Sequence, residues 1–198
     1  QGLSDGYFVI PYTMQNYLSD QIQVPHIDTN APEFEEAEKG VQAEIDRIYN
    51  IKGDESVDHI HKKLYHIMWD YVGMARNEKG LKKALAMLKD IRKEFNEHVR
   101  IPGDKEGLNT ELDKAIHLRD FITMGELIAY DALERNESCG GHFREESQTE
   151  EGEAKRDDEH YMYVACWQYQ GSDDVAPTLL KEPLNYQYIK VQVRNYKK

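Results

Sequence analysis

The chain has 198 residues, 39% of them hydrophobic, so it is long enough for one domain with its own core, or one domain with appendages. Its formal net charge of -12 and pI of about 5.1 disfavour a nucleic-acid partner, because clustered Lys and Arg supply most of the affinity for phosphate backbones. No apolar run approaches the ~18 residues of a membrane span, and two cysteines are too few for a disulfide framework or a thiolate zinc site, so we expect a soluble chain from a reducing compartment, with no direct membrane span.

The first part of the chain, residues 1–22, combines a helical pattern with an aromatic side. It starts within an apolar pattern and without an initiator Met, which indicates the middle of a larger protein. Residues 4–19 are predicted to form a helix whose aromatic side is poorly covered within one chain, because a loose tail rarely exposes so much apolar surface. Packing against the chain's own helices is the alternative. The side chains concerned are Tyr7, Phe8, Val9, Ile10, Tyr12 and Tyr17.

A polar linker over residues 23–30 leads to the first strong helix signal. Thr29 or Asn30 can cap this helix, Pro32 suits its first turn, and Gly53 marks its end. Apolar residues at helical spacing predict one buried face. They are Phe34, Ala37, Val41, Ile45 and Ile48.

Two more helices with the same rhythm are predicted after Ser56, a plausible cap, and after the break at residues 77–80. Such a repeat is typical of antiparallel helices that pack at a shallow angle. Gly73 interrupts the second pattern, where a glycine costs ~1 kcal/mol relative to Ala, so we expect another backbone to approach it closely. The apolar positions are Val57, Ile60, Leu64, Ile67, Tyr71 and Ala75, then Leu81, Ala84, Leu88, Ile91 and Phe95.

A loop at residues 101–108 precedes the fourth helix, for which Thr110 to Asp113 are predicted to form a capping box. Its stripe of mostly small side chains predicts a central position in the bundle: Leu112, Ala115, Ile122, Gly125, Ala129 and Ala132. The predicted fold is therefore mainly α: an antiparallel three- to four-helix bundle, similar to a spectrin repeat, over residues 23–146.

After Arg156 the period changes from helical to alternating, which predicts a loop and a small antiparallel β hairpin with an extended C-terminal region over residues 147–198. The first strand is predicted over residues 161–169, with a turn at residues 171–174. Residues 186–193 are predicted to return beside it as the second strand, with Pro177 and Pro183 in the connection.

The side chains themselves define no active site. His59, His61 and His66 lack the i,i+4 spacing of a helical metal pair, and Cys139 with His142 is half a metal motif without its second half. The carboxylates near residues 145–158 are flanked by arginines and favour ion pairs over acid–base chemistry. No glycine-rich phosphate loop follows a strand, so no dinucleotide fingerprint is present.

Four stretches, in the right order, resemble the flavoprotein subunit of succinate dehydrogenase and fumarate reductase, a family that includes L-aspartate oxidase. The clearest is Glu137–Glu146 followed by Arg156, Asp157 and Asp158, which is similar to the family's E-S-R-G-A-H-x-R-x-D and R-D-D signature. Cys139, Gly141 and Glu146 depart from it, and residues 147–155 lengthen the loop. The other stretches are residues 1–13, 68–76 and 194–196.

The resemblance implies a C-terminal part of a larger enzyme that interconverts succinate and fumarate with FAD. Residues 1–22 would be a remnant helix of the upstream FAD-binding domain, and the residues that hold FAD and substrate would lie upstream, which leaves no catalytic, cofactor or metal residue here and an inactive, colourless fragment. Implied partners are the chain's own N-terminal FAD-binding domain, an iron–sulfur subunit and a membrane anchor subunit, at the cytoplasmic face of a bacterial inner membrane. L-aspartate oxidase and a stand-alone helical interaction module are the alternatives.

The joint between helices and strands is the one candidate site that we infer. Gly140 and Gly141 would let the chain turn off the fourth helix and bring His142 and Arg144 close to Asp157 and Asp158. Arg144 and Arg156 would organise the loop through charge-assisted bonds to carboxylates and backbone carbonyls, and present it to the flavin domain. The alternative is an ordinary surface turn. The predicted interface residues are Gly140, Gly141, His142, Arg144, Arg156, Asp157 and Asp158.

Overall fold

A computed structural model describes residues 2–105 and 107–192, which form two compact units, Gln1–Glu44 and Ile45–Lys198. The chain is mostly helical with a small antiparallel β hairpin, as the sequence predicts. Among the described residues, no helix is both long and apolar enough to cross a membrane.

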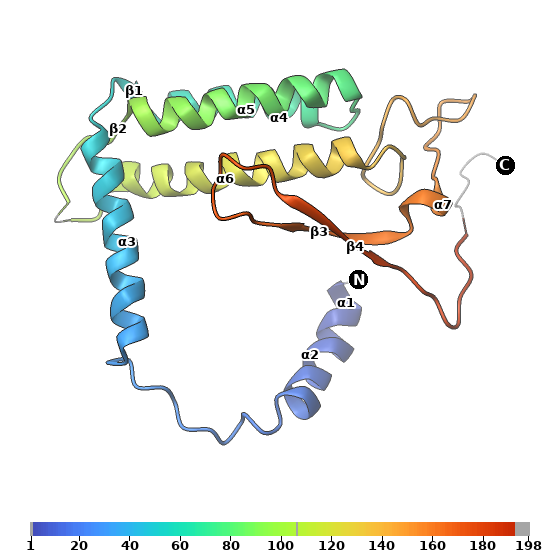
Figure 1. Ribbon diagram of the computed structural model, residues 1–198, viewed down its shortest axis with the longest axis horizontal. Coiled ribbons are helices and arrows are strands. Elements are labelled where there is room, and N and C mark those ends of the chain that lie inside the picture. The colour runs from blue at the N-terminus through green and yellow to red at the C-terminus, as the bar shows by residue number, and fades with distance from the viewer. Residues whose placement is uncertain (1, 106, 193–198) are drawn as a thin grey trace. The chain divides into compact units, whose positions relative to one another are not determined.

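The first unit contains the predicted N-terminal helix. Helical backbone runs without a break from Gly2 to Tyr17, through α1 (Gly2–Ser4), η1 (Asp5–Val9), α2 (Ile10–Tyr12) and η2 (Thr13–Tyr17), where the η segments are π-helical (Figure 1). Its aromatic side chains are exposed, Tyr7 and Phe8 each by 73%.

Helix α3 (Pro32–Ile51) begins in the first unit and ends in the second. The expectation of one continuous buried face is wrong for its first half, since Phe34 and Val41 are exposed by 47% and 62%. Only Ile48 of the five predicted apolar positions is buried, and it belongs to the core of the second unit. The apolar period therefore predicts the helix correctly, but it does not show which turns find a packing partner.

The second unit is built on three helices, α4 (Val57–Val72), α5 (Glu78–His98) and α6 (Thr110–Glu134), each of which packs against the other two (Figure 1). Short connections make them successive antiparallel neighbours, which confirms the predicted helical bundle. One contiguous core lies between them and includes Leu64, Leu88, Phe95 and Ile122. Gly125 of α6 lies in this packing, where an added Cβ would be 3.1 Å from Met68 Sδ.

Side-chain caps fix where these helices begin. The Ser56 hydroxyl accepts from His59 N, as predicted, and Asn77 accepts from Gly80 N. The capping box expected at Thr110 is wrong, because Thr110 is already the first residue of α6. Its N-cap is Asn109, whose Oδ1 accepts from Glu111 N at 3.0 Å and Leu112 N at 3.1 Å.

Two glycines differ from expectation in their packing. Gly73 is the C-cap of α4 rather than an interior residue, and the atom that crowds its missing Cβ is the Trp69 carbonyl oxygen of its own helix, at 2.7 Å. Close approach of another segment occurs instead at Gly53, where an added Cβ would lie 1.9 Å from the His98 carbonyl oxygen. This approach sits beside a short parallel pair, β1 (Glu55–Ser56) with β2 (Val99–Arg100).

The C-terminal region contains α7 (Asp158–Tyr161), β3 (Tyr163–Gln168) and β4 (Thr178–Pro183). The strands are antiparallel, with Ala165 opposite Lys181. The predicted first strand is confirmed, but the second was placed too late: residues 184–192 contain no strand, and Val193 lies outside the described residues. The prolines misled the prediction. Pro183 ends a strand with one neighbour, where a missing N–H is tolerated.

Candidate functional site

The candidate site lies where α6 ends, at residues 135–158, here called the joint. Cys139 and His142 form a tight turn in which Cys139 N donates to His142 O at 2.9 Å and His142 N donates to Cys139 O at 3.1 Å. Gly140 has a φ of 60°, in the left-handed region that a Cβ disfavours. Gly141 needs no such backbone, so only Gly140 is required for the turn.

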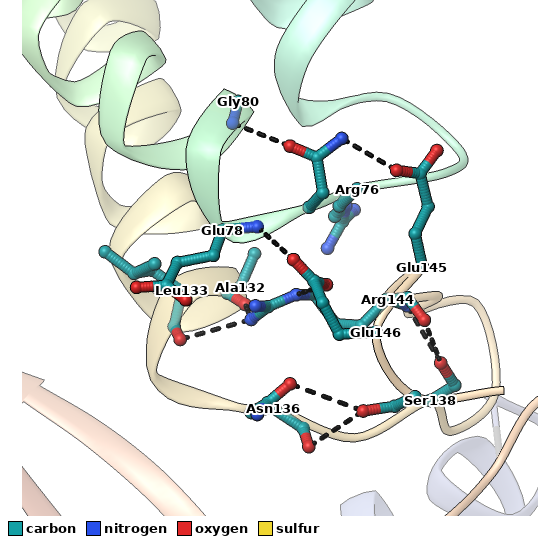
Figure 2. A network of polar contacts seen from close by, with 12 residues as sticks. Arg76, Glu78, Gly80, Ala132, Leu133, Asn136, Ser138, Arg144, Glu145 and Glu146 are labelled. Carbon is teal, nitrogen blue, oxygen red and sulfur yellow. Dashed lines mark hydrogen bonds and ion pairs between the residues drawn. The ribbon is translucent and has the colours of Figure 1, made fainter.

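The joint is fixed to the connection between α4 and α5 by backbone pairing. Arg76 N donates to Phe143 O at 3.1 Å, and Glu145 N donates to Arg76 O at 2.8 Å. Carboxylates extend the pairing, since Glu145 accepts from the Asn77 side chain at 2.7 Å and Glu146 from the backbone of Glu78 at 2.6 Å (Figure 2).

Sequence reasoning did not foresee this docking. Both partners lie in stretches that resemble the same family, residues 68–76 and 137–146, and that shared resemblance was the available signal.

Arg144 is the buried centre of the joint, with a side chain only 2% exposed. Its Nη1 donates to the carbonyls of Ala132 at 2.8 Å and Leu133 at 3.2 Å, and its Nε donates to Glu146 Oε2 at 3.1 Å (Figure 2). The last carbonyls of a helix have no partner within the helix, so Arg144 also closes the end of α6. Its backbone N donates to Ser138 Oγ at 2.8 Å, and this hydroxyl donates back to Arg144 O at 3.1 Å.

His142 is held as a neutral imidazole between two groups. Its Nε2 lies 2.8 Å from the Arg135 carbonyl and must donate, because a carbonyl only accepts. Its Nδ1 therefore accepts from Arg76 Nη1 at 2.9 Å. Burial lowers the pKa of His142, the Arg135 carbonyl opposes this, and the positive charges of Arg76 and Arg144 lower the pKa further.

Glu137 is a second buried anchor, which the sequence did not single out. It is 3% exposed, accepts from Arg135 Nη1 at 2.8 Å, and accepts from Asp157 N at 2.9 Å. Glu137 thus ties the end of α6 to the start of α7. The insertion between them is a small closed loop, since Lys155 N donates to Ser147 O at 3.1 Å and Ser138 N to Lys155 O at 2.9 Å.

The contacts of the arginines confirm part of the predicted arrangement and correct the rest. Arg156 Nε donates to Asp158 Oδ1 at 2.9 Å, and its Nη1 donates to Gln192 O at 3.1 Å, so Arg156 does bind a carboxylate and a carbonyl. Asp157 caps α7 through His160 N. His142 and Arg144 contact neither aspartate, because the pairing of residues 143–145 with Arg76 turns them toward the connection between α4 and α5.

Burial divides the joint into a base and a tip. Glu137, Ser138 and Arg144 form a buried base, whereas the tip, residues 139–141, is exposed. No other atom lies within 4 Å of a Cβ added at Gly140 or Gly141, so the tip projects away from the unit that carries it. The described residues contain no group of three metal-ligating side chains, and His59, His61 and His66 are all exposed.

Comparison with known proteins identifies the class to which this fold and joint belong. Residues 61–196 match the family described as "Fumarate reductase flavoprotein C-term". The chain therefore belongs to the family of C-terminal domains of succinate dehydrogenase and fumarate reductase flavoprotein subunits, which confirms the resemblance drawn from the sequence.

Individual relatives agree with this assignment. The chain is 34% identical over 111 residues to an uncharacterized FAD-dependent oxidoreductase of Methanocaldococcus jannaschii, a match covering 56% of this chain and 20% of that protein. It is 27% identical over 133 residues to the fumarate reductase flavoprotein subunit of Escherichia coli K12, covering 67% of this chain and 21% of the relative. These matches thus cover about a fifth of the length of each relative.

A solved structure shares the fold. A quinol fumarate reductase chain of E. coli superposes with a TM-score of 0.68 at 23% identity, over 83% of this chain and 27% of the other. At that identity the similarity shows the fold alone.

Proposed function

We propose that this chain is the C-terminal helical part of a flavoprotein subunit that interconverts succinate and fumarate with FAD and passes the electrons to an iron–sulfur subunit. Within it, the chain would be structural, and its joint would be a preformed contact with the subunit's own FAD-binding domain. The proposed contact rests on the division of the joint into a buried base, whose polar groups form hydrogen bonds within the chain, and an exposed tip.

The geometry favours a contact surface over a catalytic one. The hydrogen-bonding groups of Arg144, His142 and Glu137 are engaged by backbone and side-chain partners within the chain. These side chains are therefore not available to bind a reacting substrate. What the tip offers outward is backbone and the exposed Cys139. Because the base already holds the tip in one conformation, little conformational entropy is lost when a second domain covers the tip.

The parent assembly follows from the same proposal. We propose that the parent subunit works in a complex with an iron–sulfur subunit and a membrane anchor subunit, peripheral to the cytoplasmic face of a bacterial inner membrane; related structures of fumarate reductase support assembly with other subunits in general. Residues 1–22, with their exposed aromatic side, would belong to the FAD-binding domain. L-aspartate oxidase is the alternative parent, and its distinguishing features would lie upstream of this chain.

Substitution of Arg156 tests the proposed contact. In the full-length subunit we expect Arg156→Ala to lower the flavin content of the purified protein or its assembly with the iron–sulfur subunit. In the 198-residue chain the same variant should keep its Tm, because Arg156 and Asp158 are 23% and 40% exposed and such a pair contributes at most about 1 kcal/mol.

Arg119→Ala is the matched control, since Arg119 also pairs with the neighbouring Asp120 on an exposed part of α6. It should leave flavin content, assembly and Tm unchanged. Full flavin content and turnover in the Arg156→Ala subunit would leave the joint as an ordinary surface turn.

A further inference from the structure

A cavity of about 220 Å³ lies in the second unit, between α5, α6 and the turn that connects β3 to β4. It shares no lining residue with the joint. Three aromatic side chains line it, Tyr130, Trp167 and Tyr169, together with charged residues from α5, α6 and the turn. The proposed function gives this cavity no role.

The floor of the cavity is a buried ion pair without spare donors. Arg92 Nη2 donates to Glu126 Oε2 at 2.6 Å, and the two side chains are 10% and 12% exposed. Arg92 Nη1 donates to Asp173 Oδ2 at 3.0 Å and to Thr123 Oγ1 at 3.3 Å. Two carboxylates thus surround one guanidinium, so the floor carries an excess negative charge and offers an anion no free N–H group.

The walls present aromatic faces. The Tyr130 and Trp167 rings lie 6.0 Å apart between centroids, and the Trp167 indole is fixed by donation from Nε1 to Asp131 Oδ1 at 3.0 Å. Tyr169, 65% exposed, stands at the rim. The faces of such rings carry negative potential and attract organic cations.

Two opposite charges stand at the opening. Asp174 is exposed, its backbone N donates to Ser172 Oγ at 3.2 Å, and no described residue pairs with its carboxylate. Lys89, also exposed, lines the cavity from α5. With Arg92 and Lys89 set against Glu126, Asp173 and Asp174, the lining carries one more negative than positive charge.

We propose that this cavity binds a small organic cation, an alkylammonium ion whose chain lies against the aromatic walls and whose charge faces Asp174. The volume accommodates a short alkyl chain, the walls favour a cation over a neutral or anionic group, and Asp174 supplies an unpaired carboxylate. Lys89 opposes the ligand by repulsion.

Calorimetric titration of the 198-residue chain with butylammonium chloride tests the proposal. Sodium butyrate, of nearly the same shape but opposite charge, and sodium chloride at equal ionic strength are the comparators. We expect heat of binding from butylammonium only. Tryptophan fluorescence provides a second measurement. In the Trp69→Phe variant, Trp167 is the remaining tryptophan of the chain, and the fluorescence of Trp167 should change on binding.

Charge variants make the sign of the ligand explicit. Asp174→Asn should weaken butylammonium binding about tenfold, as expected for the loss of one charged contact beside aromatic rings. Lys89→Gln should strengthen it, and Asp70→Asn, which removes an exposed carboxylate on α4 outside this cavity, should leave it unchanged. Circular dichroism checks that each variant is folded.

Several outcomes would overturn the proposal. They are an absence of butylammonium heat beyond the salt control, unchanged Trp167 fluorescence, or equal effects of Asp174→Asn and Asp70→Asn. Binding of butyrate, with the effects of Asp174→Asn and Lys89→Gln reversed, would show an anion site instead.

Discussion

At the scale of single residues, the joint depends on Arg144, a charged side chain with almost no exposed surface that contacts two helix-end carbonyls and a carboxylate. The sequence indicated that this arginine organises the loop through carbonyls and carboxylates. It could not indicate which ones, because the partners lie on α6 and on Glu146 rather than on Asp157 and Asp158. Spacing along the chain does not show which way a loop folds back.

Replacement of Arg144 by methionine should destabilise the chain by about 3 kcal/mol. The variant leaves the carbonyls of Ala132 and Leu133 without a donor and removes one of the two partners of Glu146, which keeps its bond from Glu78 N, and unsatisfied buried groups are costly. Urea unfolding followed by circular dichroism measures the change, and Arg156→Ala, at a partly exposed arginine, provides the control. A loss below about 1 kcal/mol for Arg144→Met would show that water replaces these contacts freely.

His142 should make stability depend on pH in a defined direction. Because its pKa in the folded chain lies below the ordinary value of 6.5, the unfolded chain takes up a proton first as the pH falls. The contribution of His142 is therefore complete above pH 6.5 and is lost as the pH drops through its lowered folded pKa. His142→Gln should reduce that acid loss.

His160 supplies the opposite sign for comparison. The hydrogen bond that the His160 ring donates to Asp157 raises the pKa of His160, so its contribution is present below 6.5 and lost as the pH rises through the raised folded value. Stability curves from pH 5 to 8 should therefore differ in sign between His142→Gln and His160→Gln. An identical effect of both variants would contradict the neutral, donor-and-acceptor role assigned to His142.

At the scale of elements, helix periods were the most reliable guide, since α4, α5 and α6 all follow apolar positions three and four apart. Ends and partners were less predictable. The second strand was misplaced because Pro183 looked like a break, although an edge strand accommodates it. The two-residue pairing of β1 with β2 has no pattern long enough to detect, and the crowding at Gly53 depends on contacts between distant segments.

Two adjacent residues are candidates for the N-cap of α6: Asn109, as the structure shows, and Thr110, as the sequence predicts. Asn109→Ala should cost about 1 to 2 kcal/mol, because the side chain caps two amides of the first turn and also donates to Tyr49 Oη at 2.7 Å. Thr110→Ala, the substitution that a Thr110 capping box would make damaging, should cost less than about 0.5 kcal/mol. The two free energies of unfolding decide the cap, and a larger loss for Thr110→Ala would restore the original prediction.

Gly53 should tolerate no side chain. An added Cβ would overlap the backbone at His98, which cannot move without breaking the Gly53 N to Val99 O bond of 3.2 Å, so Gly53→Ala should cost about 3 kcal/mol or more. Gly40, in the middle of α3 with open space around it, is the control. Its replacement by Ala should be neutral or stabilising by up to ~1 kcal/mol. Thermal unfolding that finds equal effects would remove the argument from crowding.

At the scale of the whole molecule, the chain consists of a bundle, a hairpin and a joint, and its matched residues cover about a fifth of the length of its relatives. Family membership could be recognised from the sequence because four short stretches occur in order. The docking of the joint on Arg76 could not be derived from those stretches separately, since it joins two of them in space. We propose that the buried base stabilises this chain and that the exposed tip contacts the FAD-binding domain.

Hydrogen–deuterium exchange at the joint, compared between the 198-residue chain and the full-length subunit, tests that assignment most directly. The base should be protected in both, because amides such as Arg144 N and Ser138 N are bonded within the chain. The amides of Gly140 and Gly141 should exchange within seconds in the isolated chain and become strongly protected in the full-length subunit. Equally fast exchange of these two amides in both proteins would contradict the account, because a contact surface that stays open to water is no contact.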